Sequence, residues 1–220
     1  MAIAYRSAGT YVSGIGNVTP GVPAGYAADD IFILFVEGDE LGALSTPSGW
    51  TYITTEVGNS SQCAAYWKRS TASESAPTYT DLGDHTSAII LALSGCLATG
   101  SPIDTFSGSS ATGTTVSFPT ITTSVANCMI VGAVAPTATA ITLATGPTNA
   151  NLTTPTSPTS NTHTDGNDGG LITFYGLKAT AGSVGATTGT TSATSQKSHL
   201  TIALKPALAA IGRSFGYIID

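Results

Sequence analysis

Charged side chains are scarce in this sequence of 220 residues, of which Asp, Glu, Lys and Arg together make up 9%. An average globular protein has about 25%, and the residues that usually cover exposed helix faces are too few here for an ordinary helical domain. Hydrophobic residues still account for 41% of the chain, which excludes the disordered class of low hydrophobicity and high charge. The length suffices to bury a core without metals or disulfides. Thr, Gly and short apolar runs instead favour β-sheets joined by loops.

Positive charge and long apolar runs are lacking as well. Lys and Arg number 7 against 13 Asp and Glu, for a net charge of −6, and the longest basic run is Lys68-Arg69. The chain therefore lacks the electrostatic footprint of a protein that binds nucleic acid or an anionic membrane. No apolar run approaches the roughly 18 residues of a transmembrane helix, and the first residues lack the pattern of a signal peptide. We expect neither nucleic acid nor a membrane among the partners.

Cysteine and histidine are too few and too scattered for the common metal and disulfide sites. The cysteines are odd in number and far apart, and we interpret them as buried, reduced thiols: Cys63, Cys96 and Cys128. The three histidines sit in unrelated contexts and give no zinc signature. Residues 165–168, DGND, come nearest to a calcium loop, but the EF-hand spacing is missing and a flexible loop is favoured. Because no nucleophile and base stand at a recognisable spacing, we expect no enzyme, no cofactor and no metal site.

Short apolar runs separated by Pro- and Gly-rich turns predict an all-β fold. Four runs are typical of central, buried strands: IFILFV (31–36), SAIILAL (87–93), CMIVGAVA (128–135) and LTIAL (200–204). Residues 51–57 and 63–69 are expected to form further strands. The pattern predicts a jelly-roll or Ig-like antiparallel β-sandwich over residues 1–206, followed by a C-terminal arm or docked terminal strand over 207–220.

The second half of the chain repeats the order of the first. Three pairs of segments resemble each other: 31–36 and 128–135, 64–73 and 172–182, 87–95 and 199–206. Such a repeat predicts two similar sheets, or two intercalated Greek-key halves, packed face to face. Chance similarity among strands rich in Thr and Ala is the competing interpretation.

Two stretches are low in complexity. Residues 145–170 are rich in Pro and Asn, which are excluded from central strands, and we expect a long surface loop there. Residues 179–195 carry Thr at nearly alternate positions. They can form an edge strand whose Thr methyl groups pack on one side while the hydroxyls face water.

Turn and strand motifs follow one another in a fixed order over residues 20–206: PAGYAADDIFILFVEG, TPSGWTYITTE, AAYWKRSTASESAPTYT, TSAIILALSG, SPIDTFSG, PTITTSVANCMIVGAV and LTIALKP. This order resembles a widespread β-sandwich family found in phage genomes and their bacterial hosts. In that family a P-x-G-D turn precedes an apolar strand, a P-x-G-W turn and an aromatic-Lys strand follow, and the domain ends in x-ALxP. This chain has Ala28-Asp29-Asp30 in place of the first Gly-Asp.

The resemblance implies a non-enzymatic structural protein of the virion, made in the host cytoplasm: a capsid decoration, a head fibre or a tail component. It carries no catalytic residues with it. We expect first a decoration or cement protein that binds the major capsid protein or other virion proteins, and that forms homo-oligomers through a large, weakly charged interface. The alternative is a carbohydrate-binding or adhesion module of a head or tail fibre that binds a surface glycan through exposed aromatic rings such as Tyr26, Tyr66 or Trp67.

Aromatic and aliphatic side chains provide the candidate partner-binding residues. Tyr66 and Trp67 point to opposite faces of one strand, so one is expected in the core and the other can meet a partner. The turn Pro47-Ser48-Gly49 is expected to fold Trp50 back onto the sandwich. Beyond Pro206, the last segment is expected to pack on a neighbouring molecule through four apolar side chains: Phe215, Tyr217, Ile218 and Ile219.

Overall fold

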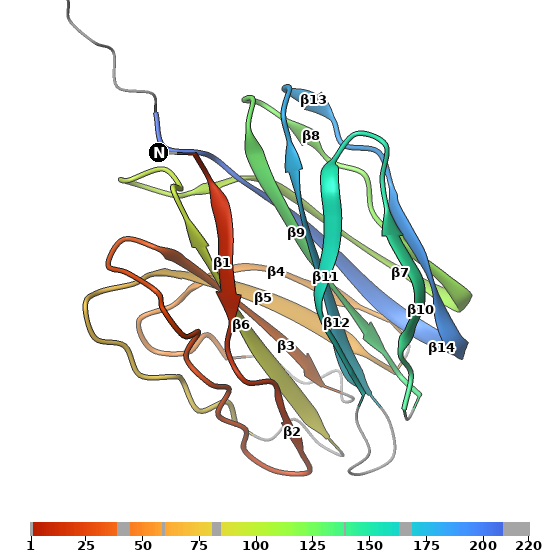
Figure 1. Ribbon diagram of the computed structural model, residues 1–220. Helices are drawn as coiled ribbons and strands as arrows, with labels where there is room; N and C mark the ends of the chain where they lie inside the picture. Colours follow the sequence, from red (N-terminus) through yellow and green to blue (C-terminus); the bar gives the residue numbers. More distant parts are fainter. Residues whose placement is uncertain are drawn as a thin grey trace, which may run out of the picture.

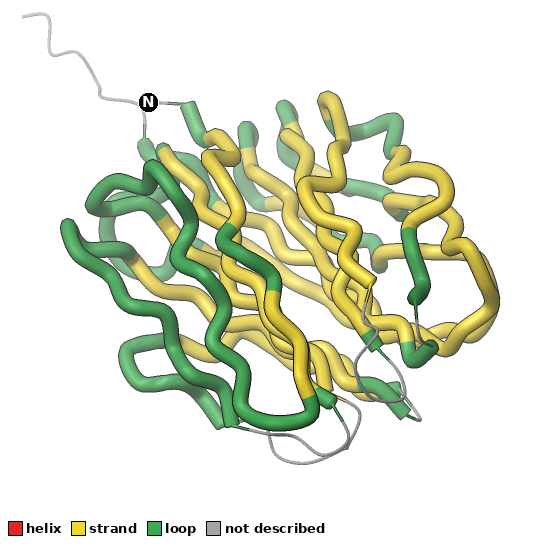
Figure 2. Tube along the Cα trace, turned by 60° about the horizontal axis from the view of Figure 1, so that its bottom comes forward, coloured by secondary structure: helices red, strands yellow, loops and turns green. Residues whose placement is uncertain are grey.

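The computed structural model describes residues 2–38, 45–58, 60–80, 85–138, 140–162 and 169–208, and every regular element within these ranges is a β-strand (Figures 1 and 2). One antiparallel sheet has the order β1-β6-β3-β5-β4, with β2 also paired to β6. Its strands are β1 (Ala4–Ala8), β2 (Val12–Gly14), β3 (Ile31–Gly38), β4 (Thr51–Val57), β5 (Gln62–Arg69) and β6 (Thr86–Ser94). The all-β expectation is confirmed.

A second antiparallel sheet has the order β10-β14-β9-β12-β11, with β7 also paired to β14. Its strands are β7 (Ile103–Phe118), β9 (Cys128–Pro136), β10 (Leu143–Thr148), β11 (Thr153–Thr162), β12 (Gly170–Lys178) and β14 (Thr187–Leu204). Two short strands, β8 (Thr122–Thr123) and β13 (Gly182–Ser183), pair with each other outside these sheets. The two large sheets form a β-sandwich.

The two sheets repeat one strand order. In the first sheet β1 lies beside β6, which is followed by β3, β5 and β4; in the second sheet β7 lies beside β14, which is followed by β9, β12 and β11. The three pairs of similar sequence segments fall on strands in equivalent places, namely β3 and β9, β5 and β12, β6 and β14. Each half of the chain builds its own sheet, so the arrangement is two similar sheets rather than two intercalated halves (Figure 1).

A central hydrophobic core lies between the two sheets. Alternate side chains of β3 enter it, among them Ile31, Ile33 and Phe35, and they pack with Val131 of β9 and Ile202 of β14. Side chains of a strand alternate between its faces, which explains why only every second residue of the IFILFV run reaches this core. Burial of these side chains supplies the main favourable free energy that holds one sheet on the other.

The outer face of each sheet is covered as well. Over the first sheet, Val18, Trp50 and Tyr79 from loops pack on Phe32 and other residues of β3, β5 and β6. Over the second sheet, the cover is Phe118, Ile121, Leu152 and Val184, which pack on residues such as Phe174. Strands covered on both faces read as continuous apolar runs rather than as alternating patterns, which is why four such runs stood out in the sequence.

Residues 145–170 are not the long loop that their composition predicted. Residues 143–148 and 153–162 form β10 and β11, and β11 is the edge strand beside β12. Pro155 and Pro158 are tolerated because an edge strand has one unpaired side, and the pairing with β12 shifts register across each of them. The prediction of an edge strand within 179–195 is also wrong in its position, since β14 pairs with β7 on one side and with β10 and β9 on the other.

Candidate functional site

A polar cluster is buried at one end of the first sheet, where β3 ends and β6 begins. Nε2 of His85 lies 2.5 Å from Oε1 of Glu37, and the hydroxyl of Ser87 donates to Oε2 of the same carboxylate at 2.7 Å. All three side chains are buried. Gly169, just before β12, lies against this cluster, and a Cβ added to it would be 2.1 Å from Nε2 of His85. The cluster therefore ties the end of the first sheet to the start of a strand in the second.

Its geometry differs from that of a nucleophile with its base. His85 and Ser87 contact different oxygens of the Glu37 carboxylate, whereas in a Ser-His-Asp triad the histidine contacts the serine hydroxyl itself. The neighbouring thiol of Cys63 is not activated either, because burial and the carboxylates of Glu37 and Glu56 raise its pKa. A thiol reacts as the thiolate, so this arrangement favours a structural role for the cluster.

All three cysteines are buried and free, as predicted. Burial raises the pKa of Cys96 to about 12. Burial, with the nearby carboxylate of Asp104, raises the pKa of Cys128 to about 11. Neither thiol is therefore suited to nucleophilic chemistry at neutral pH.

A second polar group lies under the outer cover of the second sheet. The ammonium of Lys197 donates to the carbonyl oxygens of Gly113 and of Ser195, the latter at 3.0 Å. Nδ1 of His199 lies 3.2 Å from the carbonyl oxygen of Ser109, so Nδ1 carries the proton of this contact. Burial lowers the pKa of His199 to about 4, and this side chain is neutral at physiological pH. These contacts fasten β14 to β7.

The aromatic residues of the sandwich that were predicted to bind partners are not freely exposed. Tyr66 is fully buried in the outer cluster of the first sheet, and its hydroxyl lies 2.7 Å from that of Tyr79. The prediction that Tyr66 offers a binding ring is therefore wrong, because loops cover the face of β5 on which it lies. Trp67 takes the opposite face and packs, partly buried, against the central core. Trp50 is buried, as predicted, after a turn in which Gly49 has a φ of 79°.

Tyr26 is half-buried as well. Its ring meets that of Phe32 edge to face, with centroids 5.1 Å apart, and its hydroxyl accepts a hydrogen bond from the backbone of Glu74 at 2.8 Å. Among the described aromatic residues the most exposed rings belong to Tyr52 on β4, at 50%, and Phe106 on β7, at 47%. The predicted residues Phe215, Tyr217, Ile218 and Ile219, and the 165–168 loop, lie outside the described residues.

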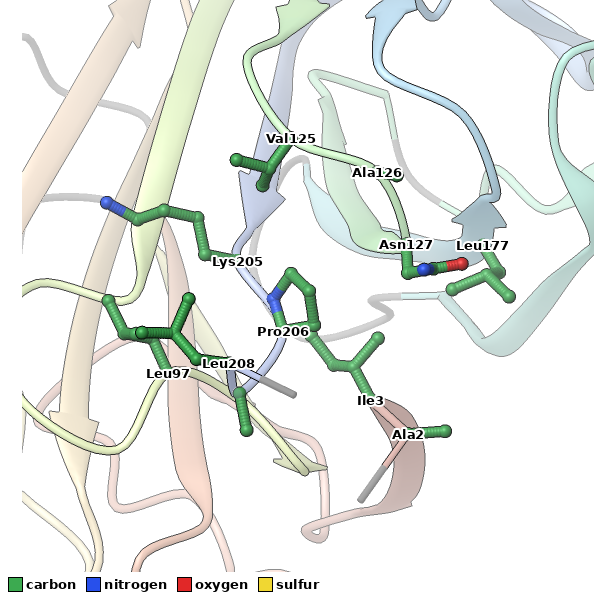
Figure 3. A pocket seen from close by; sticks show the side chains of 11 residues that line it. Ala2, Ile3, Leu97, Val125, Ala126, Asn127, Leu177, Lys205, Pro206 and Leu208 are labelled. Atoms are coloured by element: carbon green, nitrogen blue, oxygen red, sulfur yellow. The ribbon is translucent and has the colours of Figure 1, made fainter. Parts of the chain in front are cut away.

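An apolar groove of about 530 Å³ opens at the other end of the sandwich (Figure 3). The chain leaving β6 and the chain leaving β14 cross here, since the amide of Leu97 donates to the carbonyl of Lys205 at 2.9 Å and that of Ala207 to Gly95 at 2.8 Å. The side chains around the hollow come from both sheets and from the two ends of the described chain: Ile3, Leu97, Val125, Leu177, Pro206 and Leu208. This crossing forms one wall of the groove.

The groove leaves apolar surface in water. Leu208 is 83% exposed and Val125 is 38% exposed. Among the described residues that line the groove, Lys205 carries the one charge. Sequence patterns did not predict this groove, because its walls come from segments far apart in the chain. The one available signal is that the residues after β6 resemble those after β14.

Hydroxyl groups cover part of the second sheet. Thr145 and Thr190, opposite each other on β10 and β14, place their hydroxyls 2.7 Å apart, and those of Thr148 and Thr188 are 3.3 Å apart. All four residues are at least partly exposed. The surface here is polar but uncharged, which suits contacts with another protein that involve few ion pairs.

No family model, no curated protein and no solved structure matches this chain. Among the described residues, no group of three His, Cys, Asp or Glu side chains is placed to hold a metal ion. In the same part of the chain, no helix is long and apolar enough to cross a membrane.

Proposed function

We propose that this protein is a non-enzymatic structural component of a phage virion, most specifically a decoration or cement protein that binds the major capsid protein. The observation that carries the proposal is the apolar groove with the exposed Leu208 beside it, at the point from which residues 209–220 continue. An exposed apolar patch of this kind is typical of a surface that binds another protein. The resemblance of the turn and strand motifs to a phage family is the reason to propose a virion as the assembly.

The surface and the interior support a role in assembly rather than in catalysis. Thr hydroxyls, not charges, cover the strands around β10 and β14, so a partner can approach without desolvating many ions. The buried side chains of Glu37 and His85 contact each other within the sandwich, close to Gly169. Two sheets with three apolar clusters make a rigid body, which is what a repeating shell requires of its parts.

The test is binding to capsid shells. Purified protein is mixed with shells of the major capsid protein of the phage that carries its gene, and bound protein is measured by cosedimentation and located in a cryo-electron microscopy map. Leu208→Asp is expected to weaken binding at least tenfold, since an apolar contact of this size is worth about 1.5–3 kcal/mol. Ile15→Asp is the matched control, because Ile15 is also exposed, at 66%, but lies outside the groove. Equal binding by wild type and both variants, or no density on the shell, contradicts the proposal.

The alternative is a glycan-binding module of a head or tail fibre. It now depends on Tyr52, whose half-exposed ring lies on the edge strand β4 and meets the ring of Tyr66 at a centroid distance of 5.8 Å. Glycan-array binding that disappears in Tyr52→Ala, together with failure to bind shells, favours this function. Absence of glycan binding leaves the decoration proposal in place.

A further inference from the structure

The apolar groove has a specific candidate occupant in the chain itself. We propose that it binds residues 209–220 of a second copy, so that the tail of one molecule links it to the next. This inference rests on the proposed structural role and names the contact by which copies associate. It uses the groove and the sequence of the segment that continues from Leu208.

The composition of the segment fits the groove. Residues 209–220 read AAIGRSFGYIID, with large apolar side chains concentrated between Phe215 and Ile219. Apolar side chains are what a hollow lined by Leu97, Val125 and Leu177 accepts. The segment ends in Asp220, and Lys205 is the charged residue among the described groove lining. An Asp220 carboxylate near the ammonium of Lys205 fixes the direction in which the tail lies.

The length of the segment allows it to reach another molecule. Twelve extended residues span at most about 40 Å, and the seven from Leu208 to Phe215 about 25 Å. The segment is therefore long enough for its apolar residues to reach a groove on a neighbouring molecule, whereas contact with the groove of its own chain requires the segment to reverse direction. To reach the same groove on a neighbouring copy, the segment does not need to reverse direction.

The internal repeat allows the departure of the chain from β14 to be compared with its departure from β6. Residues 93–100, LSGCLATG, resemble 204–212, LKPALAAIG: each has a Leu, a Leu-Ala pair four residues later and a Gly soon after. The first of these segments carries the chain away from its own sheet to β7, which adds to β14 of the other sheet. The described part of the second segment, up to Leu208, takes part in the crossing, where Cys96 and Pro206 form a β-bridge.

Within the described residues, neither β6 nor β14 has an unpaired side that the tail could join. In the described structure β6 already lies between β3 on one side and β1 and β2 on the other, and β14 between β7 on one side and β9 and β10 on the other. A segment that leaves its own sheet as the 93–100 segment does therefore has no place beside these two strands, and the proposed contact with a second copy is made through the groove. The groove is the apolar surface that a second copy offers to the tail.

The first experiment measures self-association of the full chain by sedimentation velocity over a range of concentrations. The wild type is expected to form oligomers, while the chain truncated after Leu208 and the full chain with Val125→Asp are each expected to remain monomeric. Mixing these two proteins pairs an intact tail with an intact groove, and a heterodimer is expected. Ile15→Asp should associate as the wild type does. A wild type that is monomeric at all concentrations overturns the inference.

The second experiment uses a fluorescent peptide of residues 209–220 and the truncated protein. Binding is expected by anisotropy, with a loss of at least tenfold for Leu208→Asp in the truncated protein. Lys205→Glu should weaken binding by up to about fivefold, as for an exposed ion pair, and a peptide with Asp220→Lys should restore it. Peptide binding without oligomers of the full chain shows that the tail occupies its own groove, which refutes the second copy as occupant. No peptide binding refutes the groove as the receptor.

These outcomes are separable from the proposed function. If the tail does not bind the groove but shells still bind the protein in a manner sensitive to Leu208→Asp, the groove belongs to the capsid protein and the structural role stands. If the copies associate through the tail but shells are not bound, the inference stands and the decoration role fails.

Discussion

Acid should destabilise this protein through His199, whose imidazole is fully buried beneath Phe118, at a centroid distance of 6.0 Å. Nδ1 donates to the Ser109 carbonyl, and among the described residues Nε2 has no hydrogen-bond partner. Protonation would therefore place an N–H donor and a charge in an apolar site, with Lys197 nearby adding repulsion. Burial lowers the pKa of His199 from 6.5 to about 4, although the Ser109 contact opposes this shift.

The sign and size of the effect follow from these two values. Between pH 6.5 and 4 the unfolded chain binds a proton at this residue that the folded chain does not, so the free energy of unfolding falls as the pH falls. The values differ by about 2.5 pH units, each worth about 1.4 kcal/mol. The loss from His199 is thus about 2–3 kcal/mol at pH 4.5, approaches about 3–4 kcal/mol below pH 4, and is nearly absent above pH 7.

The assay compares urea unfolding of the wild type and His199→Asn at pH 7.5 and 4.5. Asn does not titrate, and its amide can still donate to the Ser109 carbonyl. The variant is less stable at pH 7.5 because it leaves a small cavity, but its loss on acidification should be smaller than that of the wild type by about 2–3 kcal/mol. Carboxylates titrate alike in both proteins and cancel in the comparison. Equal losses would show that His199 is charged in the folded protein or that its site admits water.

Three further substitutions test the fold. Ile33→Asp places an unpaired charge in the central core and should abolish cooperative thermal unfolding, because its cost of several kcal/mol is comparable to the whole free energy of unfolding. Ile15→Asp, on the surface, should melt as the wild type does. Gly132→Ala should lower the free energy of unfolding by about 3 kcal/mol or more, since a Cβ there would lie 2.4 Å from the Leu200 carbonyl oxygen and from the Phe174 ring; a variant of unchanged urea midpoint contradicts the packing described. Asp29→Gly should raise stability by about 0.5–1 kcal/mol, because Asp29 has a φ of 69°; a lower midpoint would show that the aspartate side chain contributes more than its backbone strain costs.

The buried strands could be predicted because both faces of each are covered. In such a strand nearly every residue is apolar, so Ile33 and Ile90 lie within long apolar runs that mark the strands in the sequence. The repeat could be predicted for the same reason, since its most similar segments are these central strands. By contrast, the strand around Pro155 and Pro158 was not predicted. Proline cannot donate a hydrogen bond to a neighbouring strand, but an edge strand tolerates it on the side that has no neighbour.

The orientation of Tyr66 and the groove lay beyond sequence reasoning for different reasons. Alternation along β5 places Tyr66 and Trp67 on opposite faces, but it does not say which face a loop will cover. The groove depends on Leu97, Val125 and Leu177, which belong to separate parts of the chain and meet only when both sheets are packed. Sequence patterns report local periodicity, and this site is made entirely of long-range contacts.

The position of β14 has a consequence for synthesis of the chain. Its residues pair with β7, β9 and β10 together, so the second sheet has a gap at its centre until the last strand has left the ribosome. The first sheet has all its strands once residue 94 has emerged. A nascent chain thus carries a finished sheet with one bare apolar face while more than half of the protein is still being made. Slow translation of the second half prolongs that exposure, and a premature stop before residue 197 leaves β9 and β7 without the strand that joins them.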